Sequence, residues 1–274
     1  YQQAFYPKGH PDDMKSLDEA VAALQALDPA ALQAFHQRWY GANGMVLAVV
    51  GDLDPKRVVE AVRKRLGNLP KREDMAIAIP AVPVRSEPGR QVTFVPDKAN
   101  VDVYLGHQGQ VLRTDDAYYP AAVANFIFGG AASSRLFQHV RDRLGLTYGI
   151  YSSLGATHGM GPWTIWMTLN PQNVERAITE VRTLAQQLVE KGVTDEELAA
   201  ARQTLTGKYK VGLATNPGLA SVIAGFESYG FPPDFVHRHP ERIEAVTRAQ
   251  IEEVLKQRFR PEVFFVSIAG TMQP

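Results

Sequence analysis

Two side chains near the middle of the chain could take part in catalysis without holding a metal ion. Arg141 carries a permanent positive charge, and Tyr148, a few residues later, ends in a phenolic hydroxyl. Both groups can donate hydrogen bonds to the oxyanion that develops when a carbonyl carbon becomes tetrahedral. Taken singly, each has an ordinary explanation, because arginines at 135, 141 and 143 are typical of a solvated helix face and Tyr148 of a strand. Together they indicate a candidate catalytic site.

The seven histidines do not form a recognisable zinc or acid–base site. Neither His-Glu-x-x-His nor His-x-x-Glu-His, the helical motifs of two classes of zinc peptidase, occurs in the chain. The one close cluster is His237, His239 and Glu241. We interpret it as a surface loop, because the two histidines are two residues apart and lie beside Pro232, Pro233 and Pro240. A new metal site there is an alternative hypothesis, but we expect none.

Serine and glycine motifs offer no other chemistry. The chain has no Gly-x-Ser-x-Gly, so Ser133 and Ser134 are interpreted as a helix cap. Gly129 and Gly130 lack both the P-loop lysine and the glycine spacing of dinucleotide sites, so they are interpreted as the end of a helix.

The elements that must position Arg141 and Tyr148 can be read from the same stretch. The pattern predicts helices at 115–128 and 134–144, and strands at 148–157 and 162–169. Gly145 suits the left-handed residue that closes a helix. Arg141 would then lie near a helix end and Tyr148 at the start of a strand, where one turn can bring both onto one site.

The rest of the chain predicts an α+β fold with two layers, in which helices pack on one face of a mostly antiparallel sheet. The further elements expected are helices at 16–26, 28–40, 55–66, 171–191, 194–211, 216–229 and 247–258, and strands at 45–50, 91–95, 101–107 and 262–269.

Two segments resemble each other at a fixed offset. Residues 28–52 align without a gap on residues 247–271, and each copy reads as a capped helix, a short turn and an apolar strand that ends in glycine. Leu32 aligns with Ile251 and Tyr40 with Phe259. An amphipathic helix followed by a strand can also align by chance, so the repeat is one of two interpretations.

A proline-rich stretch separates the two copies. Pro80, Pro83 and Pro88 disfavour both a helix and a central strand, which places a linker at about residues 70–90. We therefore predict that residues 1–80 are the C-terminal part of a first α/β domain, and that residues 81–274 are a complete second domain of the same kind. The elements of the first part would need a sheet that lies outside it.

Composition excludes several classes of partner. Lys plus Arg number 29 and Asp plus Glu also number 29, so no overall charge favours nucleic acid or an acidic membrane. The apolar run at 45–50 is much shorter than a bilayer crossing requires. Without cysteine, disulfide and thiolate chemistry are excluded, which fits a soluble protein of the cytoplasm or of a bacterial periplasm equally well.

With these motifs the chain resembles the pitrilysin and insulinase family of zinc metallopeptidases, which includes mitochondrial processing peptidase. The resemblance covers nearly the whole chain. It is carried by the glycine-rich Ser-Ser-Arg-Leu-Phe run at 129–137, the Arg-x-x-x-Gly-Leu-x-Tyr run at 141–148, the helix start at 192–198, and the helix and Val-Val-Gly-Asp strand at 28–52.

The resemblance implies duplicated α/β domains that enclose a chamber for peptide substrates. It implies that Arg141 and Tyr148 complete an active site whose zinc is held by another domain, and that Ser134 and Arg135 are structural. The family's zinc motif, which lies early in its first domain, is absent from this sequence. Zinc would therefore be the cofactor of the complete enzyme, and this chain alone is expected to be inactive.

Two functions stay open. The chain is either the C-terminal fragment or non-zinc half of a zinc peptidase, which supplies Arg141 and Tyr148 to a zinc-bearing domain, subunit or second copy, or it is an inactive structural or assembly subunit of the same fold. The sequence gives no cleavage preference and no oligomeric state.

Overall fold

The computed structural model describes residues 1–73 and 78–272 and divides into two compact units. Unit 1 is formed by Tyr1–Asp13, Ala81–Gly207 and His239–Pro274, and unit 2 by Met14–Pro80 and Lys208–Arg238. The domain limits drawn from the sequence, 1–80 and 81–274, stay a prediction. The linker expected at about 70–90 lies partly outside the described residues, and the first strand after it begins at Gly89.

Unit 1 is built on one five-stranded sheet of order β1-β5-β2-β4-β3. Its strands are β1 (Gly89–Phe94), β2 (Val101–Gln108), β3 (Gly149–Ala156), β4 (Met160–Leu169) and β5 (Phe265–Gly270). Only the β1–β5 pair is parallel, and the other three pairs are antiparallel. The mostly antiparallel sheet expected from the sequence is therefore confirmed.

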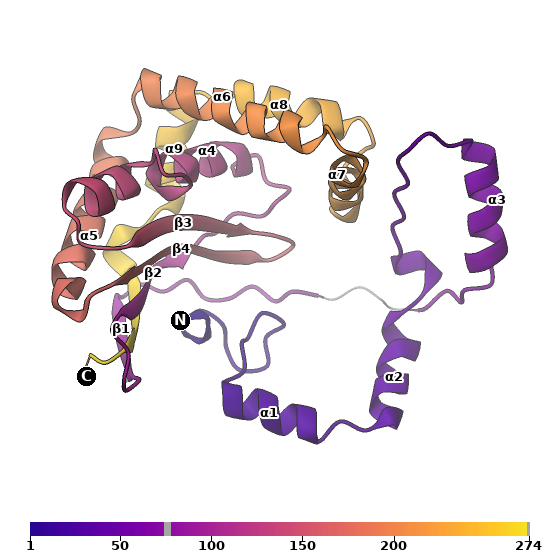
Figure 1. Cartoon of the computed structure of the whole chain (residues 1–274), viewed down its shortest axis with the longest axis horizontal. Helices are drawn as coiled ribbons and strands as arrows, with labels where there is room; N and C mark the ends of the chain where they lie inside the picture. Colours follow the sequence, from indigo (N-terminus) through magenta and orange to yellow (C-terminus); the bar gives the residue numbers. More distant parts are fainter. Residues whose placement is uncertain (74–77, 273–274) are drawn as a thin grey trace. The chain divides into compact units, whose positions relative to one another are not determined.

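Helices cover one face of this sheet (Figure 1). They include α4 (Tyr118–Gly129), α5 (Val174–Lys191) and α9 (Arg248–Arg258). In β2 the side chains alternate, because Val103 and Leu105 are fully buried while Tyr104 between them is 40% exposed. The core thus lies between the sheet and these helices, which confirms the two-layer α+β class. Helix α6 (Asp195–Gly212) follows α5, and no helix of the described chain is both long and apolar enough to cross a membrane.

Unit 2 is helical, and its helices begin where side-chain caps predict. Its helices are α1 (Leu17–Gln25), α2 (Pro29–Trp39), α3 (Pro55–Leu66) and α7 (Asn216–Ser228). The Asp28 side chain accepts a hydrogen bond from the Ala31 amide, and the Asp54 side chain one from the Lys56 amide. These bonds satisfy amides that a helix start leaves without partners.

The strand predicted at 45–50 is not formed in unit 2. These residues lie outside regular secondary structure, and Met45, Leu47 and Val49 are about half exposed. Their apolar sequence is typical of a strand, but a strand needs a neighbour to which its backbone can bond. The sequence prediction is therefore wrong for the chain as it stands.

The surface loop predicted around His237 is also wrong, because these residues form α8 (Phe235–Glu244). Pro240 lies inside this helix and has no amide hydrogen to give the Val236 carbonyl, which would normally accept it. The Tyr209 hydroxyl donates a hydrogen bond to that carbonyl instead, at 2.8 Å. A distant side chain thus lowers the cost of proline in the helix.

Candidate active-site residues

The segment that carries Arg141 is a π-helix, η3 (Phe137–Arg143), where the sequence predicts an ordinary α-helix at 134–144. The Leu144 amide donates to the His139 carbonyl, five residues back, at 3.0 Å. At its start the Ser134 hydroxyl accepts a 3.5 Å hydrogen bond from the Phe137 amide, as expected of a cap. Short π-helical stretches are rare in proteins overall, but those that occur are often found at functional sites. They displace a side chain from the position it would have in a regular α-helix.

Gly145 ends this helix in the left-handed region, with φ +61°, as the sequence predicts. Its amide donates to the Arg141 carbonyl at 3.1 Å, and the Leu146 amide donates to the Val140 carbonyl at 3.0 Å. These bonds fold the chain back immediately after Arg141. The turn therefore leads directly from the arginine towards Tyr148.

The Arg141 guanidinium is about half exposed and is held by its neighbours on the helix. It lies 5.0 Å from the centre of the Phe137 ring, and its Nη1 is 2.6 Å from Oδ1 of Asp142. Arg141 therefore points a charged group to solvent with part of that charge balanced by Asp142.

Tyr148 precedes β3 and has a fixed backbone but a free side chain. Its amide donates to the Thr168 carbonyl at 3.1 Å, and the buried Thr147 hydroxyl donates to the same carbonyl at 2.6 Å. The Tyr148 side chain is 67% exposed, and no residue of the described chain hydrogen-bonds its hydroxyl. The structure places Arg141 and Tyr148 at the two ends of one helix–strand turn but shows no direct contact between their side chains.

Arg135 is not part of a solvated face, because it is paired with Glu197 of α6. Its Nε and Nη2 donate to the two carboxylate oxygens at 2.7 and 2.6 Å, and Nη2 also donates to the Gly192 carbonyl at 2.9 Å. Both side chains are less than a third exposed. The structure thus gives Arg135 the structural role that the resemblance implies.

The sequence did not predict that Glu197 would be the partner of Arg135, although Glu197 belongs to a recognised motif. Glu197 lies in the helix start at 192–198, one of the motifs on which the resemblance rests. A second anchor that was missed joins His139 of η3 to Glu180 of α5 at 2.9 Å. Together these contacts tie the π-helix to the helical layer.

His237, His239 and Glu241 do not come together as a metal site. Within residues 1–73 and 78–272, no group of three or more His, Asp or Glu side chains could hold a metal ion. Nδ1 of His239 instead lies 2.8 Å from the Tyr119 hydroxyl. Burial, together with the nearby positive charge of Arg113, lowers the pKa of His239 to about 4. The described residues therefore do not fit a zinc ion by themselves.

Residues 26–205 match the family model described as the peptidase M16 inactive domain. A protein named an uncharacterized zinc protease from Streptomyces coelicolor is 28% identical over 250 residues, which are 87% of this chain and 53% of that protein. One of the same description from Mycobacterium tuberculosis is 27% identical over 243 residues, 86% of this chain and 54% of that protein. The chain thus spans about half the length of these curated relatives.

Solved structures share the fold. The peptidase M16 inactive domain from Pseudomonas fluorescens superposes with a TM-score of 0.87 at 22% identity, over 99% of this chain and 64% of that one. A chain of complex III2 from Candida albicans superposes with a TM-score of 0.80 at 16% identity, over 99% of this chain and 65% of that one. The family match spans more than half of the sequence and confirms the resemblance to zinc metallopeptidases. The chain therefore belongs to the peptidase M16 inactive-domain family.

Proposed function

We propose that this chain is the C-terminal portion or non-zinc half of a zinc-dependent peptidase, and that it supplies Arg141 and Tyr148 to an active site whose zinc is held by another domain or subunit. Zinc-protease names among the relatives support the reaction class. The substrate would be a peptide, and the zinc-bearing partner would be a further domain, another subunit or a second copy.

The observation that carries this proposal is the Tyr148 hydroxyl. It is a hydrogen-bond donor with no partner in the described chain, on a backbone fixed through Thr168, next to the turn that carries Arg141. The fixed backbone keeps the position from which the side chain extends, and the unpartnered hydroxyl does not have to break another hydrogen bond within the described chain before it donates to a developing oxyanion. Arg141, with its charge about half exposed, would stabilise the same negative charge.

The test replaces Tyr148 by Phe in the complete enzyme and measures peptide hydrolysis. Loss of one oxyanion donor lowers kcat by about 10² to 10³ fold with little change in KM. Tyr151→Phe is the matched control, because Tyr151 is also an exposed tyrosine of this strand region, but its ring stacks on Trp166 and makes a tilted contact with Phe137. We expect Tyr151→Phe to leave kcat within about twofold. Unchanged turnover in Tyr148→Phe would remove Tyr148 from the mechanism.

A structural or assembly subunit is the second candidate, and the ion pair between Arg141 and Asp142 favours it. A guanidinium that already has a carboxylate at 2.6 Å has less charge to offer a substrate. The two candidates differ in the effect of Asp142→Asn on the complete assembly. If Arg141 acts in catalysis, releasing it changes turnover; if it acts only in the fold, turnover stays the same and only stability changes.

A further inference from the structure

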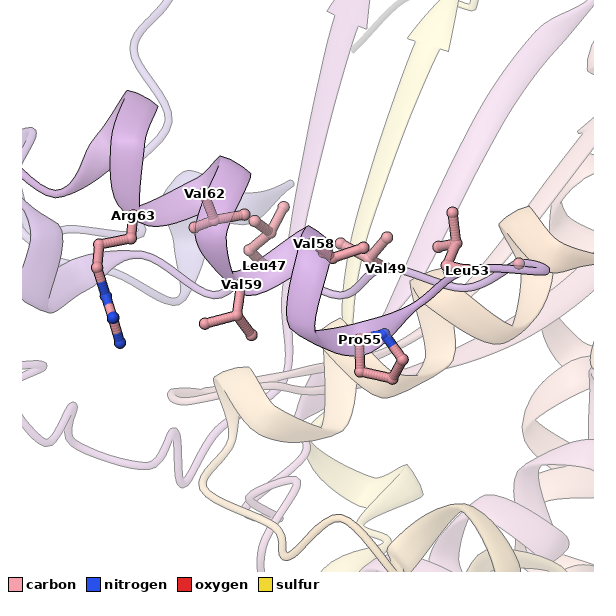
Figure 2. A pocket seen from close by; sticks show the side chains of 9 residues that line it. Leu47, Val49, Leu53, Pro55, Val58, Val59, Val62 and Arg63 are labelled. Atoms are coloured by element: carbon pink, nitrogen blue, oxygen red, sulfur yellow. The ribbon is translucent and has the colours of Figure 1, made fainter.

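Aromatic side chains stay exposed on the sheet of unit 1, although this sheet already has its helical layer. In unit 2, the apolar hollow of about 580 Å³ around Leu47, Val49 and Val62 has a ready explanation, because the elements of residues 1–80 are expected to need a sheet that lies outside them (Figure 2). That explanation does not extend to unit 1, whose sheet is present. Exposed aromatic residues on its open face, the side opposite α4, α5 and α9, therefore indicate a surface that binds another molecule (Figure 1).

Three side chains lie together on this open face. They occupy positions that alternate with buried residues, since Asp102 and Tyr104 flank the fully buried Val103 of β2, and Trp166 follows the fully buried Ile165 of β4. Tyr104 lies directly opposite Trp166 in the antiparallel pair, and the Trp166 indole N–H donates a hydrogen bond to Oδ1 of Asp102 at 3.3 Å. We call Asp102, Tyr104 and Trp166 the open-face cluster.

The N-terminal segment covers part of the open face but leaves this cluster accessible. The centre of the Tyr1 ring lies 5.7 Å from that of Tyr104, and the Gln108 side chain donates to the Phe5 carbonyl at 3.3 Å. Tyr104 is nevertheless 40% exposed, and Asp102 is also exposed. A side chain from another molecule can therefore contact both the ring and the carboxylate.

The charge of the open face is negative and comes from Asp102. The strand positions on this face are 91, 93, 102, 104, 106, 108, 149, 151, 153, 162, 164, 166, 168, 265, 267 and 269, and of these residues only Asp102 is charged. Arg90 of β1 lies on the helical side, where it pairs with Glu175 of α5. Among the residues that the structure describes, Trp166 is the hydrogen-bond partner of the Asp102 carboxylate, and no basic group forms an ion pair with it. An exposed carboxylate of this kind attracts a cation.

The open-face cluster lies a few peptide residues away from the proposed oxyanion donor. Thr168 of β4 pairs with Asp102 on one side and with Gly149 of β3 on the other, and its carbonyl also accepts the Tyr148 amide. Neighbouring strands are about 4.8 Å apart, so the backbones at Asp102 and Gly149 are about 10 Å apart. An extended peptide covers this distance in about three residues.

We propose that Asp102, Tyr104 and Trp166 form a subsite for a lysine or arginine side chain of the peptide substrate, about three residues from the bond that is cleaved. The aliphatic stem of this side chain packs on the exposed parts of the two aromatic rings, and its charged head meets the Asp102 carboxylate. A wholly apolar side chain leaves the carboxylate without a partner, and an acidic one is repelled by it. The inference deepens the proposed function and rests on it, because Tyr148 defines where the cleaved bond lies.

Peptide binding to the complete enzyme tests the subsite separately from catalysis. The probes are acetylated peptides of alanine, glycine and serine with one central leucine, and with lysine, norleucine or glutamate placed two, three or four residues to either side of it. Zinc is removed with a chelator, so that no peptide is cut, and Kd is measured by calorimetry at low salt. At one spacing we expect lysine to bind about threefold more tightly than norleucine, which has the same stem without the charge, and glutamate about threefold less tightly than norleucine. Equal dissociation constants for the three peptides at every spacing would overturn the proposal.

A matched pair of variants assigns the preference to Asp102. Asp102→Asn keeps the size of the side chain and removes its charge, so the lysine preference over norleucine should fall below about 1.5-fold. Asp116→Asn removes the same charge from an exposed position just before α4, a helix of the covered side, and should keep the preference at about threefold. A lysine preference that survives Asp102→Asn, or that both variants reduce equally, would contradict the role of Asp102.

The Trp166 indole N–H locates the contact in the 274-residue chain. Because it donates to Asp102, its NMR signal should shift more with the lysine peptide than with the norleucine peptide, and an unchanged Trp166 signal would overturn the subsite. The proposed function fails separately, if Tyr148→Phe leaves turnover unchanged while the lysine preference and its loss in Asp102→Asn persist. The subsite alone fails if Tyr148→Phe lowers turnover but the three peptides bind equally.

Discussion

The ion pair between Arg135 and Glu197 is expected to stabilise this protein measurably. Two short hydrogen bonds of 2.7 and 2.6 Å join the guanidinium to both carboxylate oxygens, with side chains 21% and 29% exposed. Fully exposed pairs contribute less than about 1 kcal/mol, whereas breaking a buried pair costs about 3 to 5 kcal/mol. Since this pair is bidentate and lies between those limits, we expect a coupling free energy of about 2 kcal/mol.

The coupling is measured by a double-mutant cycle of Arg135→Ala, Glu197→Ala and the double variant, from the free energy of unfolding in urea. Each single variant also loses a backbone contact, Arg135 to the Gly192 carbonyl and Glu197 to the Thr194 amide, and the cycle cancels both losses. In thermal unfolding the coupling corresponds to about 4 to 8 °C in Tm.

The same pair has a defined pH dependence. Burial alone would raise the pKa of Glu197, but hydrogen bonds from Arg135 and the Thr194 amide outweigh it and lower the pKa below its ordinary value. A carboxyl with a lowered folded pKa stabilises the fold above its unfolded pKa and loses that contribution as pH falls through the folded pKa. The coupling should therefore shrink as the pH falls below the usual carboxyl range. A coupling under about 0.5 kcal/mol at neutral pH, or one that does not change with pH, would refute this reasoning.

Two further predictions concern single positions in unit 1. His107 is 2% exposed, and burial lowers its pKa to about 4 despite the contact of its ring with the Gln108 carbonyl. The neutral ring therefore contributes its full share to the free energy of unfolding above about pH 6.5, and that free energy should fall by about 3 kcal/mol as the pH approaches 4. An NMR titration of the His107 ring checks this, and a midpoint near pH 6.5 would contradict it. Gly145→Ala should cost about 1 to 2 kcal/mol because φ there is +61°, whereas Gly207→Ala, inside α6 with open space around the new methyl group, should stabilise by about 0.5 to 1 kcal/mol. Thermal unfolding of the two variants compares them, and shifts of the same sign would show that the φ argument is wrong.

Features that depend on near neighbours in the chain were predictable from the sequence. The starts of α2 and α3 follow Asp28 and Asp54, whose side chains reach amides two or three residues ahead. The left-handed turn at Gly145 follows from glycine's lack of a Cβ. The class of the sheet followed from the alternation of apolar residues, such as Val103 and Leu105 on either side of Tyr104.

Features that depend on distant partners were not predictable. The segment at 45–50 has the sequence of a strand but no strand neighbour in the described part of its unit. Helix α8 contains Pro240, and the carbonyl freed by that proline is satisfied by Tyr209, far away in the sequence. The pattern of apolar residues predicts neither feature. It indicates which face of a helix or strand is apolar, but it does not indicate which distant residues pack against that face or bond to its backbone.

The sequence alone determined the fold class, the resemblance to zinc metallopeptidases and the choice of Arg141 and Tyr148, because local propensity and short motifs carry that information. Only the tertiary structure decided that Arg141 lies on a π-helix, that Tyr148 is exposed with no partner among the described residues, and that Arg135 is held by Glu197. The physical reason is that exposure and ion pairing are set by groups from separate parts of the chain, which meet only when the layers pack together.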